Sequence, residues 1–167
     1  MSLTMQLMTD MLTLSAHLPE IEVDGGDVIM HDGEAGKGIW VLVSGKLEVR
    51  KDGVLVNTIT EPGAIIGEVS VLLGTGHSAT VAATEPTRLR FAADGDVLLA
   101  SDPAITRLVA IGLAERLSFV TTYLADLKHQ YADVPGLSMV SDVLTSLNQR
   151  RAPLAVPGSL RDPDPQY

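Results

Sequence analysis

The sequence predicts a mainly β fold with flanking helices, in which the strands form a closed barrel or jelly roll. Twelve of the 15 glycines in the 167-residue chain lie between Gly25 and Gly95, in a stretch that is also rich in Val, Ile and Thr. Glycines that alternate with short β-branched runs are typical of strands joined by tight turns. The strands recur at a spacing of about 8–12 residues, as in barrels and jelly rolls. The flanks are nearly free of glycine and predict helices.

The N-terminal flank predicts one helix over residues 4–18. Met5, Met8 and Leu12 fall on one face of this segment, at the three- and four-residue spacing of an amphipathic helix. Pro19 follows directly and cannot continue the helix, so we expect the helix to end there.

The central stretch, residues 21–93, predicts a meander of at least six strands. The apolar run at residues 39–43 contains Trp40 and predicts a strand that is buried on both faces. Asp52 and Gly53 predict a hairpin, because both central positions of a type I′ turn need a positive φ. The strands are expected at Asp27–Met30, Ile39–Val43, Lys46–Arg50, Val54–Ile59, Ser78–Ala83 and Thr87–Phe91.

The C-terminal flank, residues 94–131, predicts two helices. A short helix should run through Ala100 with Asp94 or Asp96 as its N-cap, and a long helix should begin at Pro103. Apolar residues on the long helix follow a heptad spacing, which predicts a homodimer contact; packing on its own barrel is the alternative. This seam consists of Leu113, Leu117, Val120, Leu124 and Leu127, continued by Tyr131.

The helices and the β-roll together predict one domain over residues 1–131. Residues 132–167 are expected to hold an extra helix, Ser138–Gln149, and a disordered tail from Ala152, where prolines are frequent and apolar residues are few. A helix-turn-helix domain is not expected after the long helix.

Composition and charge exclude several classes of function. The 21 acidic and 12 basic residues give a net charge of -9, which disfavours general binding to nucleic acid phosphates. The absence of cysteine excludes disulfides, cysteine-based zinc sites and thiol nucleophiles. We expect a cytoplasmic protein without a membrane segment, because the N-terminus lacks the basic start of a signal peptide. Neither a catalytic constellation nor a histidine pair at metal-ligand spacing occurs, so an enzyme or a metal site is not expected.

The segment Gly67–Val81 carries the residues best suited to binding. Gly67 and Glu68 precede one apolar turn, a glycine-rich bend and a strand. A helical turn that starts here would present unpaired main-chain N–H groups, which bind anions. Glu68 would repel an anion, but it suits a ligand that also carries hydroxyls, such as a ribose. His77 and Ser78 could close over the same anion.

This segment, called the cassette below, closely resembles the phosphate-binding cassette of cyclic nucleotide-binding domains. That family has a Gly-Glu pair, a short apolar helix, an arginine nine residues after the glutamate and a small-residue Ala-Thr-Val strand; Gly67, Glu68 and the run 78–81 match this spacing. Residues 33–47 resemble the family's second conserved loop and strand. The resemblance covers about residues 21–131 and implies a double-stranded β-helix, which is a jelly-roll-like fold.

The resemblance implies a site for cAMP or cGMP, with no metal and no other cofactor. In the family the glutamate binds the ribose 2′-hydroxyl, so this role falls to Glu68. Donors to the cyclic phosphate would come from Gly67, Val69, Ser78 and Ala79. A residue on the family's long helix often caps the base, which Phe119 or Tyr123 could do here; core packing is the alternative.

Three positions depart from the family pattern. His77 stands at the arginine position, Gly76 stands where a proline is common, and Lys37 replaces the usual acidic residue of the earlier loop. Arginine offers a permanent charge and a bidentate fork, whereas histidine is mostly neutral at its reference pKa of ~6.5. Losing a charge-assisted contact costs about 1.5–3 kcal/mol, or roughly ten- to a hundredfold in affinity. If His77 must be protonated to replace arginine, affinity should rise as the pH falls. The alternative is a solvated loop residue of a decayed site.

These observations predict a stand-alone regulatory module that binds a cyclic nucleotide and signals allosterically to a protein partner or to its own dimer. Ligand would reposition the short helix and the long helix after Pro103. A degenerate, ligand-free scaffold for protein interaction or oligomerisation is the alternative. A transcription regulator of the catabolite activator type is disfavoured, and with it a DNA partner, because such regulators carry a helix-turn-helix domain.

Overall fold

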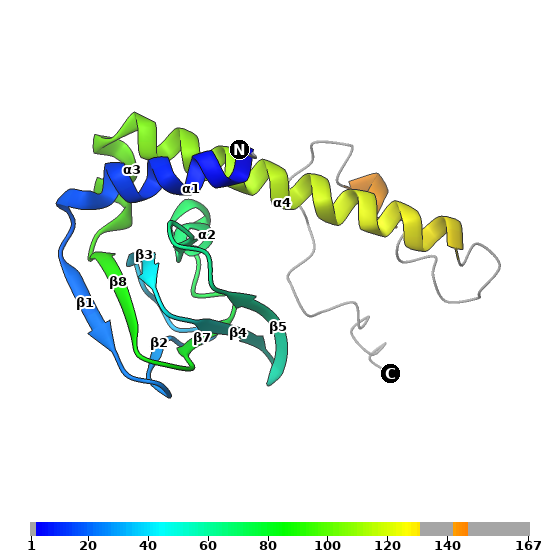
Figure 1. Cartoon of the computed structure of the whole chain (residues 1–167). Helices are drawn as coiled ribbons and strands as arrows, with labels where there is room; N and C mark the ends of the chain where they lie inside the picture. The colour runs from blue at the N-terminus through cyan, green and yellow to red at the C-terminus, as the bar shows by residue number, and fades with distance from the viewer. Residues whose placement is uncertain (1–2, 131–141, 147–167) are drawn as a thin grey trace, which may run out of the picture. The chain divides into compact units, whose positions relative to one another are not determined.

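A computed structural model of the chain describes residues 3–130 and 142–146 (Figure 1). It confirms the predicted fold class, with eight antiparallel strands in two sheets and flanking helices. The helical elements are α1 (Leu3–Leu14), the 3₁₀ turn η1 (Ser15–His17), α2 (Glu68–Leu73), α3 (Gly95–Ser101) and α4 (Pro103–Gln130). The strands are β1 (Glu20–Val23), β2 (Val28–Met30), β3 (Ile39–Ser44), β4 (Leu47–Lys51), β5 (Val54–Ile59), β6 (Ile65–Ile66), β7 (Thr80–Ala83) and β8 (Thr87–Ala92).

The two sheets have the strand orders β1-β8-β3-β6 and β2-β7-β4-β5. In the first sheet, β3 lies between β8 and β6, so that Trp40 stands opposite Phe91 on one side and Ile66 on the other. The hairpin of β4 and β5 turns at Asp52 and Gly53, both of which have a positive φ, as the sequence predicts.

Strand β3 separates two hydrophobic cores and is buried on both faces, which confirms the prediction for residues 39–43. Ile39 and Val41 pack against the helices, in a cluster that includes Met11, Val71, Leu98, Ile105 and Val109. Trp40 and Leu42 face the interior of the roll, where the cluster includes Met30, Leu47, Ile66, Val81 and Leu89. The period of two along a strand places alternate side chains on these opposite faces.

The helix caps follow the predicted pattern. Asp94 is the N-cap of α3, because its side chain accepts a hydrogen bond of 3.1 Å from the amide of Val97. Asp102 caps α4 in the same way, accepting from the amide of Ala104 at 2.9 Å. Of the two candidates for the first cap, the structure therefore selects Asp94.

Several element boundaries differ from the sequence prediction. The first helix is α-helical only to Leu14 and tightens into η1, and Leu18 is already extended. The strand predicted at residues 78–83 begins at Thr80. Two short strands, β1 and β6, were not predicted: β1 alternates half-buried and exposed residues, and β6 has only two residues.

Helix α4 is long and apolar enough, by length and composition, to cross a membrane. A long apolar helix of a soluble protein meets the same criterion, and α4 also carries charged residues such as Arg116 and Asp126. The absence of a membrane partner therefore stays a prediction.

The chain divides into two compact units, residues 1–113 and 114–167, and α4 runs through both. A single domain over residues 1–131 stays a prediction. Of the predicted helix Ser138–Gln149, residues 142–146 are helical. Its remaining residues and the tail from Ala152 lie outside the described part of the chain.

Candidate functional site

The cassette connects β6 to β7 through α2. Gly67 leaves β6 with a φ of 94°, a left-handed conformation that side chains rarely adopt. A Cβ at this position would also collide with the carbonyl oxygen of Gly38 and approach the Trp40 ring to 3.2 Å. Gly74 ends α2 with a second left-handed residue, at a φ of 62°. Glycine is therefore required at Gly67 both for the backbone conformation and for space.

Glu68 is the first residue of α2, and it is only 2% exposed. The first amide with a partner inside this turn is that of Val71, which donates to the carbonyl of Gly67 at 3.3 Å. A buried carboxylate must be hydrogen-bonded to be tolerated. Among the described residues, every fully buried side-chain oxygen and nitrogen has a hydrogen-bond partner. A ligand hydroxyl that binds Glu68 would therefore have to replace a polar contact that the carboxylate already makes within the chain.

His77 is also buried, with 6% of its surface exposed, so its expected solvation in the alternative is wrong, while the decayed site itself stays an alternative. Its Nδ1 lies 3.1 Å from the hydroxyl of Ser70, which is on α2 and is itself buried. Its ring packs edge-to-face with that of Trp40, at an interplanar angle of 61° and with the two ring centroids 6.3 Å apart. Trp40 in turn stacks on Phe91 at 5.1 Å. The imidazole is thus held between α2 and the apolar interior of the roll.

The loop at residues 32–38 is joined to the cassette by main-chain hydrogen bonds. The amide of Gly33 donates to the carbonyl of His77 at 2.7 Å, and the amide of His77 donates to the carbonyl of Glu34 at 2.9 Å. Gly36 leaves space for the imidazole, because a Cβ there would collide with Nε2 of His77 and lie 2.9 Å from its Cε1. The position of the His77 ring is therefore set by the loop as well as by α2.

Lys37 connects the same loop to α3. Its ammonium forms an ion pair with Asp96 at 3.0 Å, and this hydrogen bond raises the pKa of Lys37 above its ordinary value. The amide of Gly95 donates to the carbonyl of Lys37 at 2.7 Å. Lys37 thus contacts α3 through both its side chain and its main chain.

The remaining predicted residues differ in their positions. Gly67 is buried, and Val69 is half-buried on α2. Ser78 is exposed and Ala79 is half-buried, and both lie in a bend before β7 rather than in the strand itself. Phe119 and Tyr123 are exposed on α4, at 72% and 56%, and belong to the second unit. Their predicted role as base caps therefore stays a prediction.

Sequence reasoning missed Ser70. The residue lies in the apolar turn between Glu68 and Gly74, where the pattern marks it only as a helix residue. A small polar residue at a position that is expected to be buried was the available signal.

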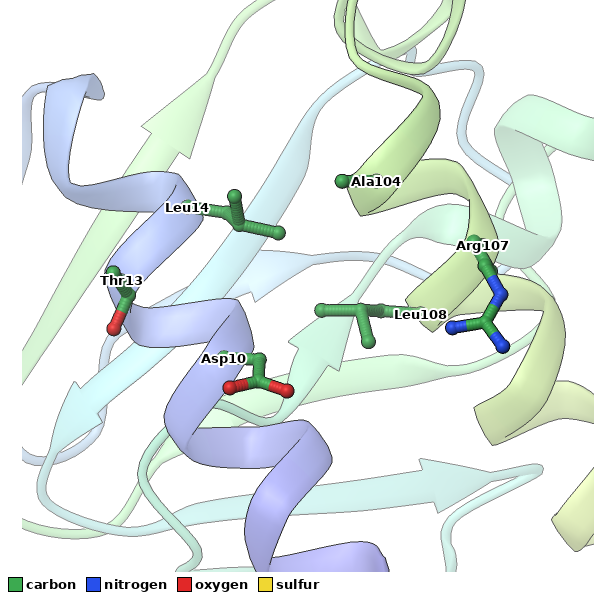
Figure 2. Close-up of a pocket in the computed structure, with 6 residues that line it drawn as sticks. All are labelled: Asp10, Thr13, Leu14, Ala104, Arg107 and Leu108. Atoms are coloured by element: carbon green, nitrogen blue, oxygen red, sulfur yellow. The ribbon is translucent and has the colours of Figure 1, made fainter.

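A separate groove of about 270 Å³ lies between α1 and the start of α4 (Figure 2). Leu14 and Leu108 form apolar parts of its wall, and Asp10 and Arg107 extend from opposite helices. None of the predicted ligand residues lines this groove, so it is distinct from the cassette.

Comparison with known proteins places residues 20–99 on the family model described as "Cyclic nucleotide-binding domain". The cAMP-dependent protein kinase regulatory subunit of Yarrowia lipolytica is 38% identical over 69 residues, which are 41% of this chain and 18% of that protein. The CRP-like cAMP-activated global transcriptional regulator of Mycobacterium tuberculosis is 31% identical over 145 residues, which are 82% of this chain and 62% of that protein. The chain thus spans less than two thirds of either relative.

A solved structure of similar fold is the catabolite activator protein of Thermus thermophilus. It superimposes with a TM-score of 0.60 at 24% identity and covers 71% of this chain and 59% of that one. At this level of identity the similarity establishes the fold of the roll and its helices.

Proposed function

We propose that the chain is a non-catalytic regulatory module that binds cAMP or cGMP at its cassette, because residues 20–99 match the family model of the cyclic nucleotide-binding domain. Glu68 would accept hydrogen bonds from the ribose hydroxyl. Main-chain or hydroxyl donors of Gly67, Val69, Ser78 and Ala79, together with His77, would contact the cyclic phosphate. We further propose a cytoplasmic location.

The burial of Glu68 within the cassette is the observation that carries this proposal. A carboxylate that is 2% exposed is costly in a small fold unless its charge has specific partners. Glu68 directly follows Gly67, whose left-handed φ of 94° is rarely adopted by residues with a side chain. The family model covers both residues. Because Glu68 already has polar contacts within the chain, it is the position of this buried carboxylate directly after Gly67, inside the matched family model, that supports a binding role over a purely structural one.

A contact route from the cassette to the helices supports allosteric signalling. His77 bonds to the main chain at Gly33 and Glu34, and the same loop bonds to α3 through Lys37. A ligand that shifts the His77 segment would therefore pull on the start of α3. Such coupling requires that ligand bind two states with different affinity.

We propose that the output of this route is a protein partner or a homodimer formed along α4. The proposed seam is Leu113, Leu117, Val120, Leu124 and Leu127. Leu117 and Val120 are exposed in the single chain, as an unpaired dimer seam would be. Phe119 and Tyr123 are proposed as base caps, and no DNA partner is proposed.

Titration calorimetry of the full chain with cAMP and with cGMP tests the proposal. The wild-type protein should bind at least one of them, and Glu68→Gln should weaken binding roughly ten- to a hundredfold, because a charge-assisted hydrogen bond is lost. Glu85→Gln, in the exposed turn before β8, is the matched control and should bind like wild type. An absence of heat with both nucleotides, in wild type and in His77→Arg, contradicts the proposal.

A ligand-free interaction scaffold is the second candidate. It is favoured by the internal pairing of the cassette, in which the side chains of Ser70 and His77 bond to each other. Thermal unfolding separates the two functions, since a nucleotide that binds only the folded state must raise the melting temperature. An unchanged melting temperature at millimolar nucleotide supports the scaffold.

A further inference from the structure

The hydrogen bond between Ser70 and His77 constrains where the protons of the two side chains lie. Both side chains are buried, with Ser70 at 3% exposure, and the Ser70 hydroxyl lies 3.1 Å from Nδ1 of His77. Among the described residues this is the one hydrogen bond of the Ser70 side chain. The direction of this bond therefore decides whether the hydroxyl proton has an acceptor.

Proton counting fixes the direction for a neutral imidazole. If Nδ1 carried the proton and donated to Ser70, the hydroxyl hydrogen would be buried without an acceptor, which is costly. If Ser70 donates instead, Nδ1 accepts and both groups are satisfied. The ring proton of the neutral histidine then resides on Nε2, because a neutral imidazole carries one N–H.

The position of Nε2 leaves this N–H available. Nε2 lies beside Gly36, where a side chain would collide with it. No described residue contains a fully buried side-chain nitrogen without a partner, so Nε2, which has no bonded partner, retains access to solvent. The charged neighbours on the loop make other contacts: Glu34 reaches His77 through its main chain, and Lys37 pairs with Asp96. Glu68 is the charged residue of α2 and has contacts of its own.

We propose that Ser70 is a positioning residue that fixes His77 in the Nε2–H tautomer, so that the cassette offers an uncharged donor to an anionic oxygen of its ligand. This proposal rests on the proposed function for its ligand, a cyclic phosphodiester. It replaces the charge-dependent contact expected from sequence with one that persists when His77 is neutral. The hydroxyl of Ser70 acts on the ligand through the imidazole and does not touch it.

The first test needs no nucleotide. The full chain is labelled with ¹⁵N-histidine, and two-bond proton–nitrogen correlations are recorded at pH 8, with the His77 signals assigned by their loss in His77→Gln. Wild type should show the Nε2–H tautomer with a hydrogen-bonded Nδ1. Ser70→Ala should move the Nδ1 resonance toward that of an acceptor without a bond. A dominant Nδ1–H tautomer in wild type, or identical His77 spectra in wild type and Ser70→Ala, would overturn the proposal.

The second test is a double-mutant cycle on cAMP affinity at pH 8. Ser70→Ala should weaken binding about three- to tenfold in the protein that carries His77, as expected for one neutral hydrogen bond. The same change should have less than a twofold effect in the His77→Arg background, where no tautomer has to be fixed. Equal losses in both backgrounds would mean that Ser70 only supports α2, which overturns the proposal. If no nucleotide binds at all, the proposed function fails, and the tautomer experiment still decides the role of Ser70.

Discussion

At the scale of the residue, the cassette replaces a guanidinium by an imidazole. His77 is not a smaller arginine in the same space, because its ring is bonded to Ser70 and packs beside Gly36 and Trp40. An arginine would bring a permanent charge and two parallel donors, whereas a neutral imidazole brings one donor. The strength of ligand binding should therefore depend strongly on this one position.

We expect His77→Arg to raise the affinity for cAMP or cGMP roughly ten- to a hundredfold at pH 8, because it adds a charge-assisted hydrogen bond to the phosphate. Calorimetric titration measures the change. The variant's affinity should also be the same at pH 6 and pH 8, since the guanidinium does not titrate there. An affinity that stays at or below the wild-type value at both pH values would show that this position does not face the phosphate.

Residue types at fixed spacing could be predicted, but contacts across the cassette could not. Gly67 and Glu68 were identified because their order and their distance from residues 78–81 are visible along the chain. The Ser70–His77 bond spans the bend at Gly74, and its existence depends on how that bend folds back. Burial of His77 likewise results from the loop at residues 32–38, which is distant in sequence.

At the scale of the element, strand prediction succeeded where the pattern was long. β3, β4, β5 and β8 contain five or six residues each, with clear turns between them. β6 has two residues and forms only because β3 offers its free edge at Trp40 and Val41. The residues of β1 alternate as a strand should, but the strand has only four residues, directly after Pro19, which is too short a pattern to predict it. Its pairing with β8 is determined by tertiary structure.

Arg90 joins three elements of the first unit. From β8 its guanidinium donates to the carbonyl of Leu12 at the end of α1, to the hydroxyl of Ser15 at 3.3 Å, and to Glu20 of β1 at 3.2 Å. Its side chain is only 15% exposed. A cation at the C-terminal end of a helix also interacts favourably with the helix dipole.

Arg90→Ala should therefore lower the free energy of unfolding by about 1.5–3 kcal/mol, because partly buried acceptors lose a charged donor. Urea denaturation monitored by circular dichroism measures this loss. Arg88→Ala is the matched control on the same strand: Arg88 is half-exposed and should change stability by less than about 0.5 kcal/mol. Equal effects of the two substitutions would show that Arg90 does not join these elements.

At the scale of the whole molecule, α4 is the element whose surface is least explained by the single chain. Leu117, Phe119, Val120 and Tyr123 are all exposed, although the protein carries a net charge of -9 that favours solubility. Exposed apolar side chains at heptad spacing are typical of an interface between helices. The periodicity could be read from the sequence, whereas the identity of the covering partner could not.

We expect the full chain to be a dimer in sedimentation velocity at micromolar concentration, and Leu117→Lys combined with Val120→Glu to make it a monomer. The added charges would otherwise be desolvated in an apolar seam. Phe119→Ser lies off the seam and should leave the dimer intact. A wild-type monomer, or dissociation by Phe119→Ser alone, would contradict the proposed seam.

Strand β3 is a layer of main chain shared by the two clusters of buried residues, with Ile39 and Val41 on the helical side and Trp40 and Leu42 inside the roll. A loss of packing on either face moves the same backbone, and with it the hydrogen bonds to β6 and β8. The helical layer of the first unit and the strands beneath it should therefore lose their structure in a single cooperative step. The stability of the scaffold that holds the cassette is then limited by the less stable of its two clusters of buried residues.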